Sequence, residues 1–173
     1  MIQTETIVQQ IISITQDVFQ TMIGLDIVAG NYVVDRNPPG PSNGIISVIG
    51  LAGSWIGTGS ICCSAEFGCK VSSQMLMMPY TEVNEDVLDA VSELTNMIIG
   101  NFKTAAENEL GPLGLSIPTV IYGLNFCARS AGKEQWIIVP FHCENDTFEV
   151  RVCLTPNRGF THLAPQMASS SAK

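Results

Sequence analysis

Apolar residues recur every three or four positions in three stretches of the chain, a spacing typical of helices that bury one face. Each stretch ends at a residue that favours helix termination, and the third begins after a residue that can cap a helix. The predicted helices cover residues 3–22, closed by Gly24; residues 66–78, stopped by Pro79; and the segment from a cap at Asn84 or Asp86 to about Leu110.

Strands are predicted between and after these helices, where apolar residues alternate with polar ones or form short runs between turns. The segment RNPPGPSNG, residues 36–44, is dense in turn residues and marks a turn within a domain. The predicted strands cover residues 26–34, 45–51 and 56–64, one or two segments within 114–130, and residues 135–143 and 147–154, which form a hairpin around the turn ENDT.

The length and composition fit one domain with a sizeable core. The chain has 173 residues, of which 46% are apolar and 14% charged, enough apolar surface for independent folding. We expect a single domain over residues 1–156, followed by a C-terminal tail, residues 157–173, whose end, MASSSAK, is disordered.

The distribution of charge argues against several classes of partner. The formal net charge is −8, and no two of the eight Lys and Arg residues are adjacent, so no basic patch for nucleic acid or for a membrane surface is predicted. No apolar window reaches the roughly eighteen residues of a membrane span, and the N-terminus lacks the pattern of a secretory signal. We expect a cytoplasmic protein.

The spacing of cysteine and histidine does not indicate a metal site. His142 and His162 are twenty residues apart and lack the spacing of zinc ligands. The cysteines contain no CxxC pair, and in a cytoplasmic protein we expect them to be buried as small apolar side chains. They are Cys62, Cys63, Cys69, Cys127, Cys143 and Cys153.

Three methionines, Met75, Met77 and Met78, cluster at the end of the second predicted helix. Such a cluster can act as a soft binding surface, but methionine more often fills irregular gaps in a core. We therefore expect these side chains to pack in the core.

The third predicted helix separates its side chains into two faces at about 100° per residue. The apolar face carries Val87, Val91, Leu94, Ile98, Phe102 and Ala105, and the opposite polar stripe carries Asp89, Glu93, Asn96, Gly100, Lys103 and Glu107. Glu93 and Asn96 are three residues apart, so their side chains lie side by side. A glycine inside a helix costs about 1 kcal/mol relative to alanine, which suggests that another surface approaches Gly100 closely. The pattern alone still favours a solvated helix face.

A faint internal repeat accompanies this stripe. The segments ITQDVFQTMIG, residues 14–24, and VSELTNMIIG, residues 91–100, align on their last glycines without a gap. Asp17 then corresponds to Glu93, and Gln20 to Asn96. A chance match between two amphipathic helices explains the similarity equally well, so both interpretations stay open.

The string DAVSELTNMIIG, residues 89–100, followed by Pro118, resembles the D-x3-E-x2-N signature of the CheC, CheX and FliY family of phosphatases. Pro118 lies one residue nearer to Asn96 than in the family pattern. The order of predicted elements over residues 5–155 also resembles that of CheX-like proteins. A single signature copy resembles CheX more than CheC, with Asp17 and Gln20 as the degenerate remnant of a second site.

The resemblance implies an α+β fold, with long helices packed on an antiparallel or mixed sheet and a pseudo-two-fold internal repeat. It implies a phosphatase that hydrolyses the aspartyl phosphate of a CheY-like response regulator, in chemotaxis or related two-component signalling. Asn96 would orient the attacking water, Glu93 would pair with the regulator's active-site lysine, and Asp89 and Gly100 would contact the partner. Mg²⁺ is expected on the regulator, with no cofactor on this chain, and a homodimer paired through its sheets is one expected assembly.

Two other functions stay open at this point. A non-catalytic module of the same fold would bind a receiver domain or a motor component without dephosphorylating it. A metal or thiol enzyme built on the cysteines is disfavoured, because the ligand spacing is missing.

Overall fold

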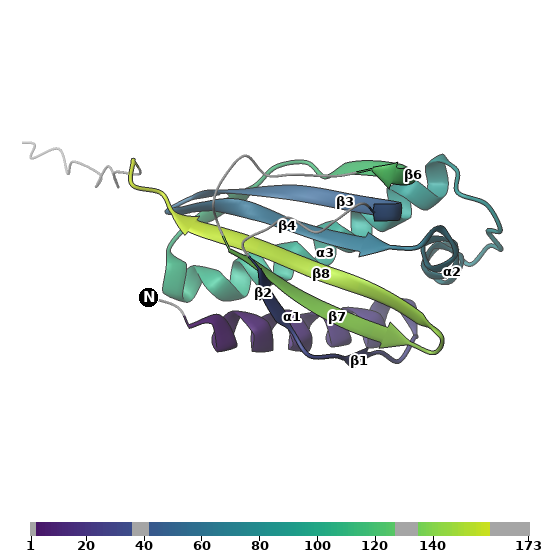
Figure 1. Cartoon of the computed structure of the whole chain (residues 1–173), viewed down its shortest axis with the longest axis horizontal. Helices are drawn as coiled ribbons and strands as arrows, with labels where there is room; N and C mark the ends of the chain where they lie inside the picture. Colours follow the sequence, from purple (N-terminus) through teal and green to yellow (C-terminus); the bar gives the residue numbers. More distant parts are fainter. Residues whose placement is uncertain (1–2, 36–41, 127–134, 160–173) are drawn as a thin grey trace, which may run out of the picture.

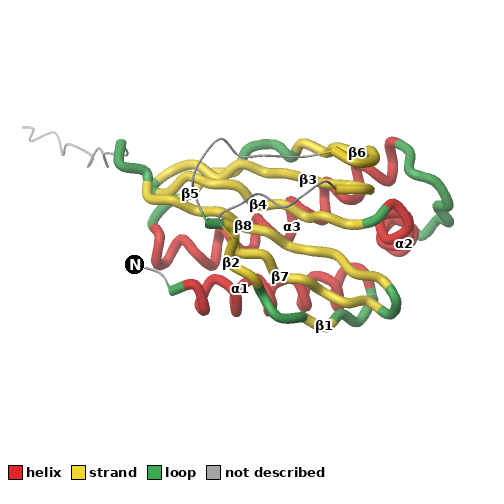
Figure 2. The backbone as a smooth tube through the Cα atoms, in the orientation of Figure 1, coloured by secondary structure: helices red, strands yellow, loops and turns green. Residues whose placement is uncertain are grey.

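The computed structural model describes residues 3–35, 42–126 and 135–159. These residues form one sheet that carries helices on one face (Figure 1, Figure 2). The helices are α1 (Thr4–Val18), continued by the π-helical turn η1 (Phe19–Ile23), α2 (Ala65–Leu76) and α3 (Glu85–Leu110). The strands are β1 (Val28–Ala29), β2 (Val33–Asp35), β3 (Ser42–Gly53), β4 (Trp55–Cys63), β5 (Leu113–Leu115), β6 (Thr119–Phe126), β7 (Trp136–Cys143) and β8 (Asp146–Pro156).

The sheet has the strand order β1-β7-β8-β4-β3-β5, and in addition β2 pairs with β7 and β6 pairs with β3. All pairs between the described strands are antiparallel. Helices α1 and α3 lie along the same face of the sheet, and α2 lies across one end of it (Figure 1). The predicted α+β class, with long helices on an antiparallel sheet, is therefore confirmed.

The order of the strands has the two-fold symmetry that an internal repeat predicts. Strands β4 and β8 pair at the centre, and β3 and β7 flank them. Each edge consists of two strands contributed by the other half of the chain. Strands β1 and β2 pair with β7, and strands β5 and β6 pair with β3. Helices α1 and α3 each precede one half, so each half completes the sheet of the other.

Local sequence signals explain where the helices begin and end. The side chain of Asn84 accepts a hydrogen bond from the backbone N–H of Val87 at 3.0 Å and caps α3. Helix α1 and its π-helical extension end, as predicted, at Gly24, whose backbone is left-handed with φ 73°. The sequence does not predict the π-helical turn itself, because bonding to the fifth residue leaves no distinctive pattern of residue types.

The core lies between the sheet and the helices that cover one face of it. Of the predicted apolar face of α3, five residues are buried and Ala105 is half-buried. Four aromatic rings stack at the end of the core near α2, where Phe148 lies 4.9 Å from both Phe19 and Phe67 and 5.2 Å from Phe141. The cysteines within the described residues are buried, as expected, and none of them is in a disulfide: Cys62, Cys63, Cys69, Cys143 and Cys153.

The expectation that the methionine cluster packs in the core is wrong for two of its three members. Met75 is half-buried and packs against the core, whereas Met77 is 91% exposed and Met78 is 59% exposed. Helix α2 ends at Leu76, and the left-handed backbone of Met77 turns the chain out of the helix. The side chains that follow therefore leave the apolar face of α2.

Several predictions fall on residues that the structure does not describe. Cys127, His162, most of the loop 36–44 and residues 160–173 of the predicted tail lie outside the described residues. Within the described residues, no helix combines the length and the apolar composition needed to cross a membrane.

Candidate active site

Helix α3 places the predicted catalytic pair on the surface while its opposite face fixes the helix to the fold. Leu94 and Ile98, on the inner face, are buried against the core. The helix contacts α1 along one side and β5 and β6 along the other. Asp89, Glu93 and Asn96 are all exposed on the outer face. The packing that immobilises α3 therefore also fixes the direction in which these three residues project.

Glu93 and Asn96 are not engaged by the rest of the described chain. Their side chains form no hydrogen bond or ion pair with any described residue. A carboxylate and an amide three residues apart on a helix lie side by side. Together they present a charged acceptor and a neutral group that both donates and accepts hydrogen bonds. Such a pair can bind a cation and orient a water molecule.

The C-terminal half of the polar stripe has a structural role instead. Lys103 Nζ pairs with Glu107 Oε1 at 2.9 Å, and the same oxygen accepts a hydrogen bond from the backbone N–H of Leu113 at 2.9 Å. This Leu113 N–H, together with the Lys103 ammonium, lowers the pKa of the Glu107 carboxyl below its ordinary value of 4.5. Lys103 and Glu107 thus attach the end of α3 to β5, which leaves the N-terminal half of the stripe open to a partner.

No contact within the described residues requires a glycine at position 100. A Cβ built on it would meet only Leu115 Cδ1, at 3.7 Å, an ordinary van der Waals contact. The sequence does not identify Leu115 as a neighbour of the stripe, because nothing in the pattern tells which strand borders α3. The cost of a glycine inside α3 therefore has no explanation in the described fold, and its proposed contact with a partner stays a prediction.

The predicted remnant of a second site lies on α1 and its π-helical extension. Asp17 and Gln20 are both exposed, as Glu93 and Asn96 are. Gln20, however, lies in η1, where the backbone N–H of Gly24 bonds to Phe19 O. The backbone between Asp17 and Gln20 nevertheless stays α-helical, since Val18 and Phe19 have φ of −60° and −65°. Asp17 and Gln20 therefore keep the spacing of Glu93 and Asn96 and differ from them in side-chain length. Pro118, the last residue of the signature, lies in the break between β5 and β6.

The buried cysteines have properties unsuited to nucleophilic chemistry. Burial raises the pKa of Cys62 to about 11 and that of Cys63 to about 12. The thiolate is the reactive form, so both groups are almost entirely protonated near neutral pH. Within the described residues, no group of three or more His, Cys, Asp and Glu side chains could hold a metal ion. The surface of α3 remains the best candidate for chemistry.

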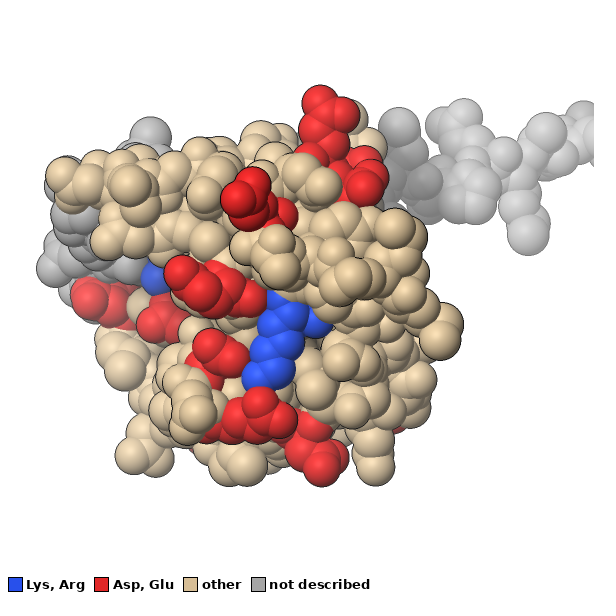
Figure 3. Space-filling view, turned by 90° about the vertical axis from the view of Figure 1, so that its right-hand side faces the viewer, with Lys and Arg blue, Asp and Glu red and all other residues tan. Residues whose placement is uncertain are grey.

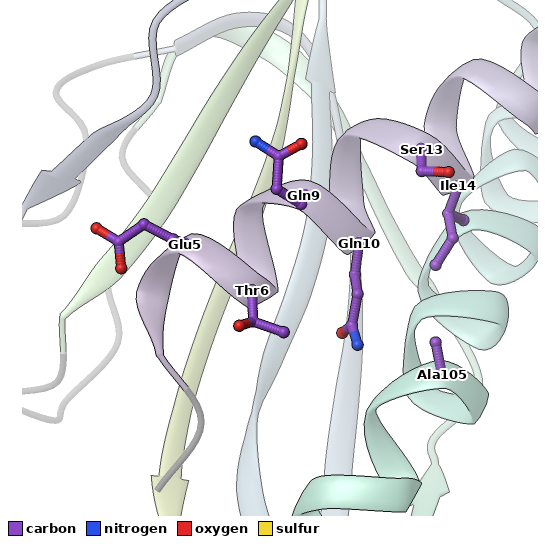
Figure 4. Close-up of a pocket in the computed structure, with 7 residues that line it drawn as sticks. All are labelled: Glu5, Thr6, Gln9, Gln10, Ser13, Ile14 and Ala105. Carbon is purple, nitrogen blue, oxygen red and sulfur yellow. The ribbon is translucent and has the colours of Figure 1, made fainter.

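A groove between α1 and α3 is a separate feature. Figure 4 shows its lining, in which side chains of α1 lie beside Ala105 of α3. The groove has a volume of about 570 Å³ and a mostly apolar surface. Its lining, which does not include Glu93 or Asn96, consists of Glu5, Thr6, Gln9, Gln10, Ser13, Ile14 and Ala105. The catalytic candidates lie instead on an exposed helix face, which suits a protein partner better than a small molecule.

Comparison with known proteins places this geometry in a family. Residues 45–142 match the family model described as chemotaxis phosphatase CheX, which is more than half of the chain. A search of curated protein sequences found no match.

Solved structures share the fold over most of the chain. The crystal structure of the chemotaxis protein CheX from Desulfovibrio desulfuricans is 27% identical, with a TM-score of 0.78 over 87% of this chain and 99% of that one. A CheC-like superfamily protein from Shewanella sp. PV-4 is 22% identical, with a TM-score of 0.78 over 89% of this chain and 99% of that one. The CheX–CheY–BeF3–Mg²⁺ complex from Borrelia burgdorferi contains a chain that is 23% identical, with a TM-score of 0.74 over 85% of this chain and 96% of that one. The chain belongs to the CheX family of chemotaxis phosphatases.

Proposed function

We propose that this protein hydrolyses the aspartyl phosphate of a CheY-like receiver domain in the cytoplasm, with Glu93 and Asn96 as its catalytic pair. One observation carries the proposal: these two side chains project, unengaged by other described residues, from a helix whose opposite face is locked in the core. Membership of the CheX family supports the phosphatase class. The Borrelia burgdorferi complex supports a receiver of the CheY type as the partner.

Asn96 orients the attacking water in this mechanism. Its amide holds a water molecule by donating one hydrogen bond and accepting another, without a proton that titrates. The water oxygen forms a bond to phosphorus as the bond between phosphorus and the aspartate oxygen breaks, so the products are inorganic phosphate and a free carboxylate. Phosphoryl transfer depends mainly on positioning and on neutralising charge. A fixed amide can therefore accelerate it without forming a covalent intermediate.

Glu93 positions the partner. Its carboxylate pairs with the lysine beside the partner's phosphorylated aspartate, which aligns the phosphoryl group with Asn96. Asp89, one turn before Glu93 on the same face, and Gly100, one turn after Asn96, contact the surrounding surface of the receiver. Mg²⁺ is expected in the acidic pocket of the receiver, where it would stabilise charge on the transferring oxygens. The Borrelia burgdorferi complex contains both Mg²⁺ and beryllofluoride.

A second copy of the chain is proposed at the β6 edge of the sheet. Among the described strands, β6 pairs only with β3. Ile117 beside it and Leu124 within it are 87% and 82% exposed, and an open strand edge with apolar side chains favours strand pairing. Sedimentation analysis would test this pairing, since a Leu124→Asp variant is expected to shift a dimer toward monomer.

The experiment that tests the proposed function separates catalysis from sequestration. A CheY-type receiver domain from the same organism is phosphorylated on its aspartate, and phosphate release is followed with this protein at one-twentieth of the receiver concentration. A catalyst speeds the decay of the whole phosphorylated pool at this ratio. A non-catalytic receiver-binding or motor-associated module would bind the receiver and leave the decay rate unchanged, and that result would reject the proposal.

A further inference from the structure

Two exposed methionines follow α2 in a segment that leads directly into the catalytic helix. We name residues 77–83 the methionine loop. Met77 is 91% exposed and Met78 is 59% exposed, and Leu76 at the end of α2 is 43% exposed. Three consecutive exposed apolar side chains at the tip of a folded element are typical of a surface that binds another molecule.

The methionine loop is held in a defined conformation. The backbone N–H of Tyr80 donates to Ser73 Oγ at 2.9 Å, and the hydroxyl of Tyr80 donates to Asp86 Oδ2 at 3.2 Å. The first bond ties the loop to α2, and the second ties it to the first turn of α3. Because the loop is fixed at both ends, its exposed side chains are displayed in advance of binding, which lowers the entropic cost of association.

The backbone conformation of Met77 is energetically unfavourable. Its φ of 54° and ψ of 35° lie in the left-handed region, which is less favourable for a non-glycine residue by roughly 1–2 kcal/mol. Glycine is the usual residue where a helix ends in this conformation. The exposed side chain of Met77 does little to stabilise the fold in return, so a role outside the fold explains its presence.

An acidic hollow adjoins the loop. It has a volume of about 320 Å³ and is lined by Ala65, Glu66, Cys69, Thr81, Glu82, Val83 and Tyr122. Glu66 and Glu82 both raise the pKa of the Cys69 thiol, after the larger effect of burial. Both carboxylates line the hollow together with Cys69. Val83 and Tyr122 supply apolar surface there, a combination that suits the apolar stem and charged head of a lysine or arginine.

The charged residues of the loop and of the first half of α3 are all acidic. Between Lys70 and Lys103 the sequence contains five acidic residues and no Lys, Arg or His. The acidic residues are Glu82, Glu85, Asp86, Asp89 and Glu93. Figure 3 shows acidic side chains spread over the end of the molecule where α2 lies, with basic side chains in two small areas. A partner that covers this end must bring positive charge to it.

A stable complex with a receiver needs a larger interface than the polar stripe of α3 can supply alone. A stable protein–protein interface covers roughly 800 Å² on each partner, far more than Asp89, Glu93 and Asn96 can offer. Glu93 is nine positions after Asn84, the cap of α3, which corresponds to a rise of about 14 Å along the helix, and a small domain is about 30 Å across. A receiver centred on the catalytic pair therefore reaches the end of the methionine loop that adjoins α3.

We infer that the methionine loop and the acidic hollow form a second part of the receiver-docking surface, which binds a basic segment of the receiver that has an apolar side chain at its centre. This inference rests on the proposed function for the identity of the partner. The loop sets affinity and selectivity among receivers, whereas Glu93 and Asn96 carry out the chemistry.

The test measures binding separately from hydrolysis. The dissociation constant for a CheY-type receiver loaded with beryllofluoride and Mg²⁺ is measured for the wild type, for Met77→Ser/Met78→Ser and for Glu66→Gln/Glu82→Gln. All four replaced side chains lie at the surface or line the hollow. Val28→Ser is the matched control, since Val28 is 66% exposed on β1 at the opposite edge of the sheet.

We expect the dissociation constant and KM to rise about tenfold in the methionine variant, with kcat within about twofold of the wild type and the control unchanged. The glutamine variant is expected to bind more weakly and to lose most of the salt dependence of binding. Wild-type affinity in the methionine variant would overturn the inference and leave the proposed function standing. A wild type that binds the receiver but does not hydrolyse its phosphate would overturn the proposed function alone, and a wild type that binds no receiver would overturn both.

Discussion

Ile99 of α3 occupies the space above Gly59 of β4. A Cβ built on Gly59 would lie 2.7 Å from both Cδ1 and Cγ2 of Ile99, closer than side-chain atoms can approach. The missing side chain lets α3 lie close to the central strands. Because Ile99 is three residues after Asn96, this contact sets the height and the rotation of the turn that carries the proposed catalytic pair.

Replacing Gly59 by alanine is expected to destabilise the protein. The added methyl group overlaps Ile99 and forces α3 away from β4, at a cost of roughly 1–3 kcal/mol. Urea unfolding followed by circular dichroism measures the change. Gly114→Ala is the control, because a Cβ there would meet only Ala52 O, at 3.5 Å. Equal stability of the two variants would contradict the proposed packing.

Gly100→Ala is expected to raise stability and to lower affinity for the receiver. Alanine in a helix is favoured over glycine by about 1 kcal/mol, and the new methyl group would meet only Leu115 Cδ1, at 3.7 Å. The same methyl group would intrude on a partner that approaches the backbone. Thermal unfolding and receiver binding are measured on the same preparation, and a gain in stability with unchanged binding would remove Gly100 from the partner surface.

The interaction that attaches the end of α3 to β5 is expected to weaken in acid. The pKa of Glu107 is held below 4.5 in the folded protein, first by the Leu113 N–H and then by Lys103. A lowered folded-state pKa means that the stabilisation is present above the unfolded-state pKa and is lost as pH falls through the folded-state value. The difference in unfolding free energy between the wild type and Glu107→Gln should therefore shrink from pH 7 to about pH 3.5. Lys103→Met removes the other partner of the ion pair, and its difference in unfolding free energy from the wild type should also shrink in acid. A difference that grows as pH falls would contradict the proposed stabilisation by Glu107.

The remnant on α1 is expected to be inactive. Asp17 is one methylene shorter than the glutamate of the signature, and Gln20 is one methylene longer than its asparagine. Their polar groups therefore reach different positions from those of Glu93 and Asn96. The double variant Asp17→Ala/Gln20→Ala should dephosphorylate the receiver within about twofold of the wild-type rate, as surface substitutions away from functional sites usually have small effects. A loss of half or more of the rate would show that each chain has two working sites.

Much of the fold is predictable from the sequence because its signals are local. The cap at Asn84, the left-handed glycine at Gly24 and the apolar spacing of α3 each act within a few residues. The hairpin of β7 and β8 also forms as predicted, because a short turn joins two alternating segments. The exchange of edge strands between the two halves is not predictable in this way, since it depends on pairing between residues far apart in the chain.

In the candidate site, too, the local features are predictable from the sequence and the long-range contacts are not. The face that carries Glu93 and Asn96 follows from helical periodicity, and the structure leaves that face exposed. The attachment of Lys103 and Glu107 to β5 is missed, because the sequence does not say which strand borders the helix. Met77 and Met78 are misplaced in the core for a related reason. The apolar pattern of α2 continues past Leu76, but the left-handed backbone at Met77 ends the helix early.

The most direct test of the central claim is the rate of receiver dephosphorylation by Asn96→Ala at saturating protein, with binding of the beryllofluoride-loaded receiver measured in parallel. Asn108→Ala, an exposed asparagine in the last turns of the same helix, is the control. If Asn96 orients the attacking water, the rate should fall about a hundredfold, while the receiver still binds and Asn108→Ala remains as active as the wild type. A wild-type rate in Asn96→Ala would contradict the mechanism.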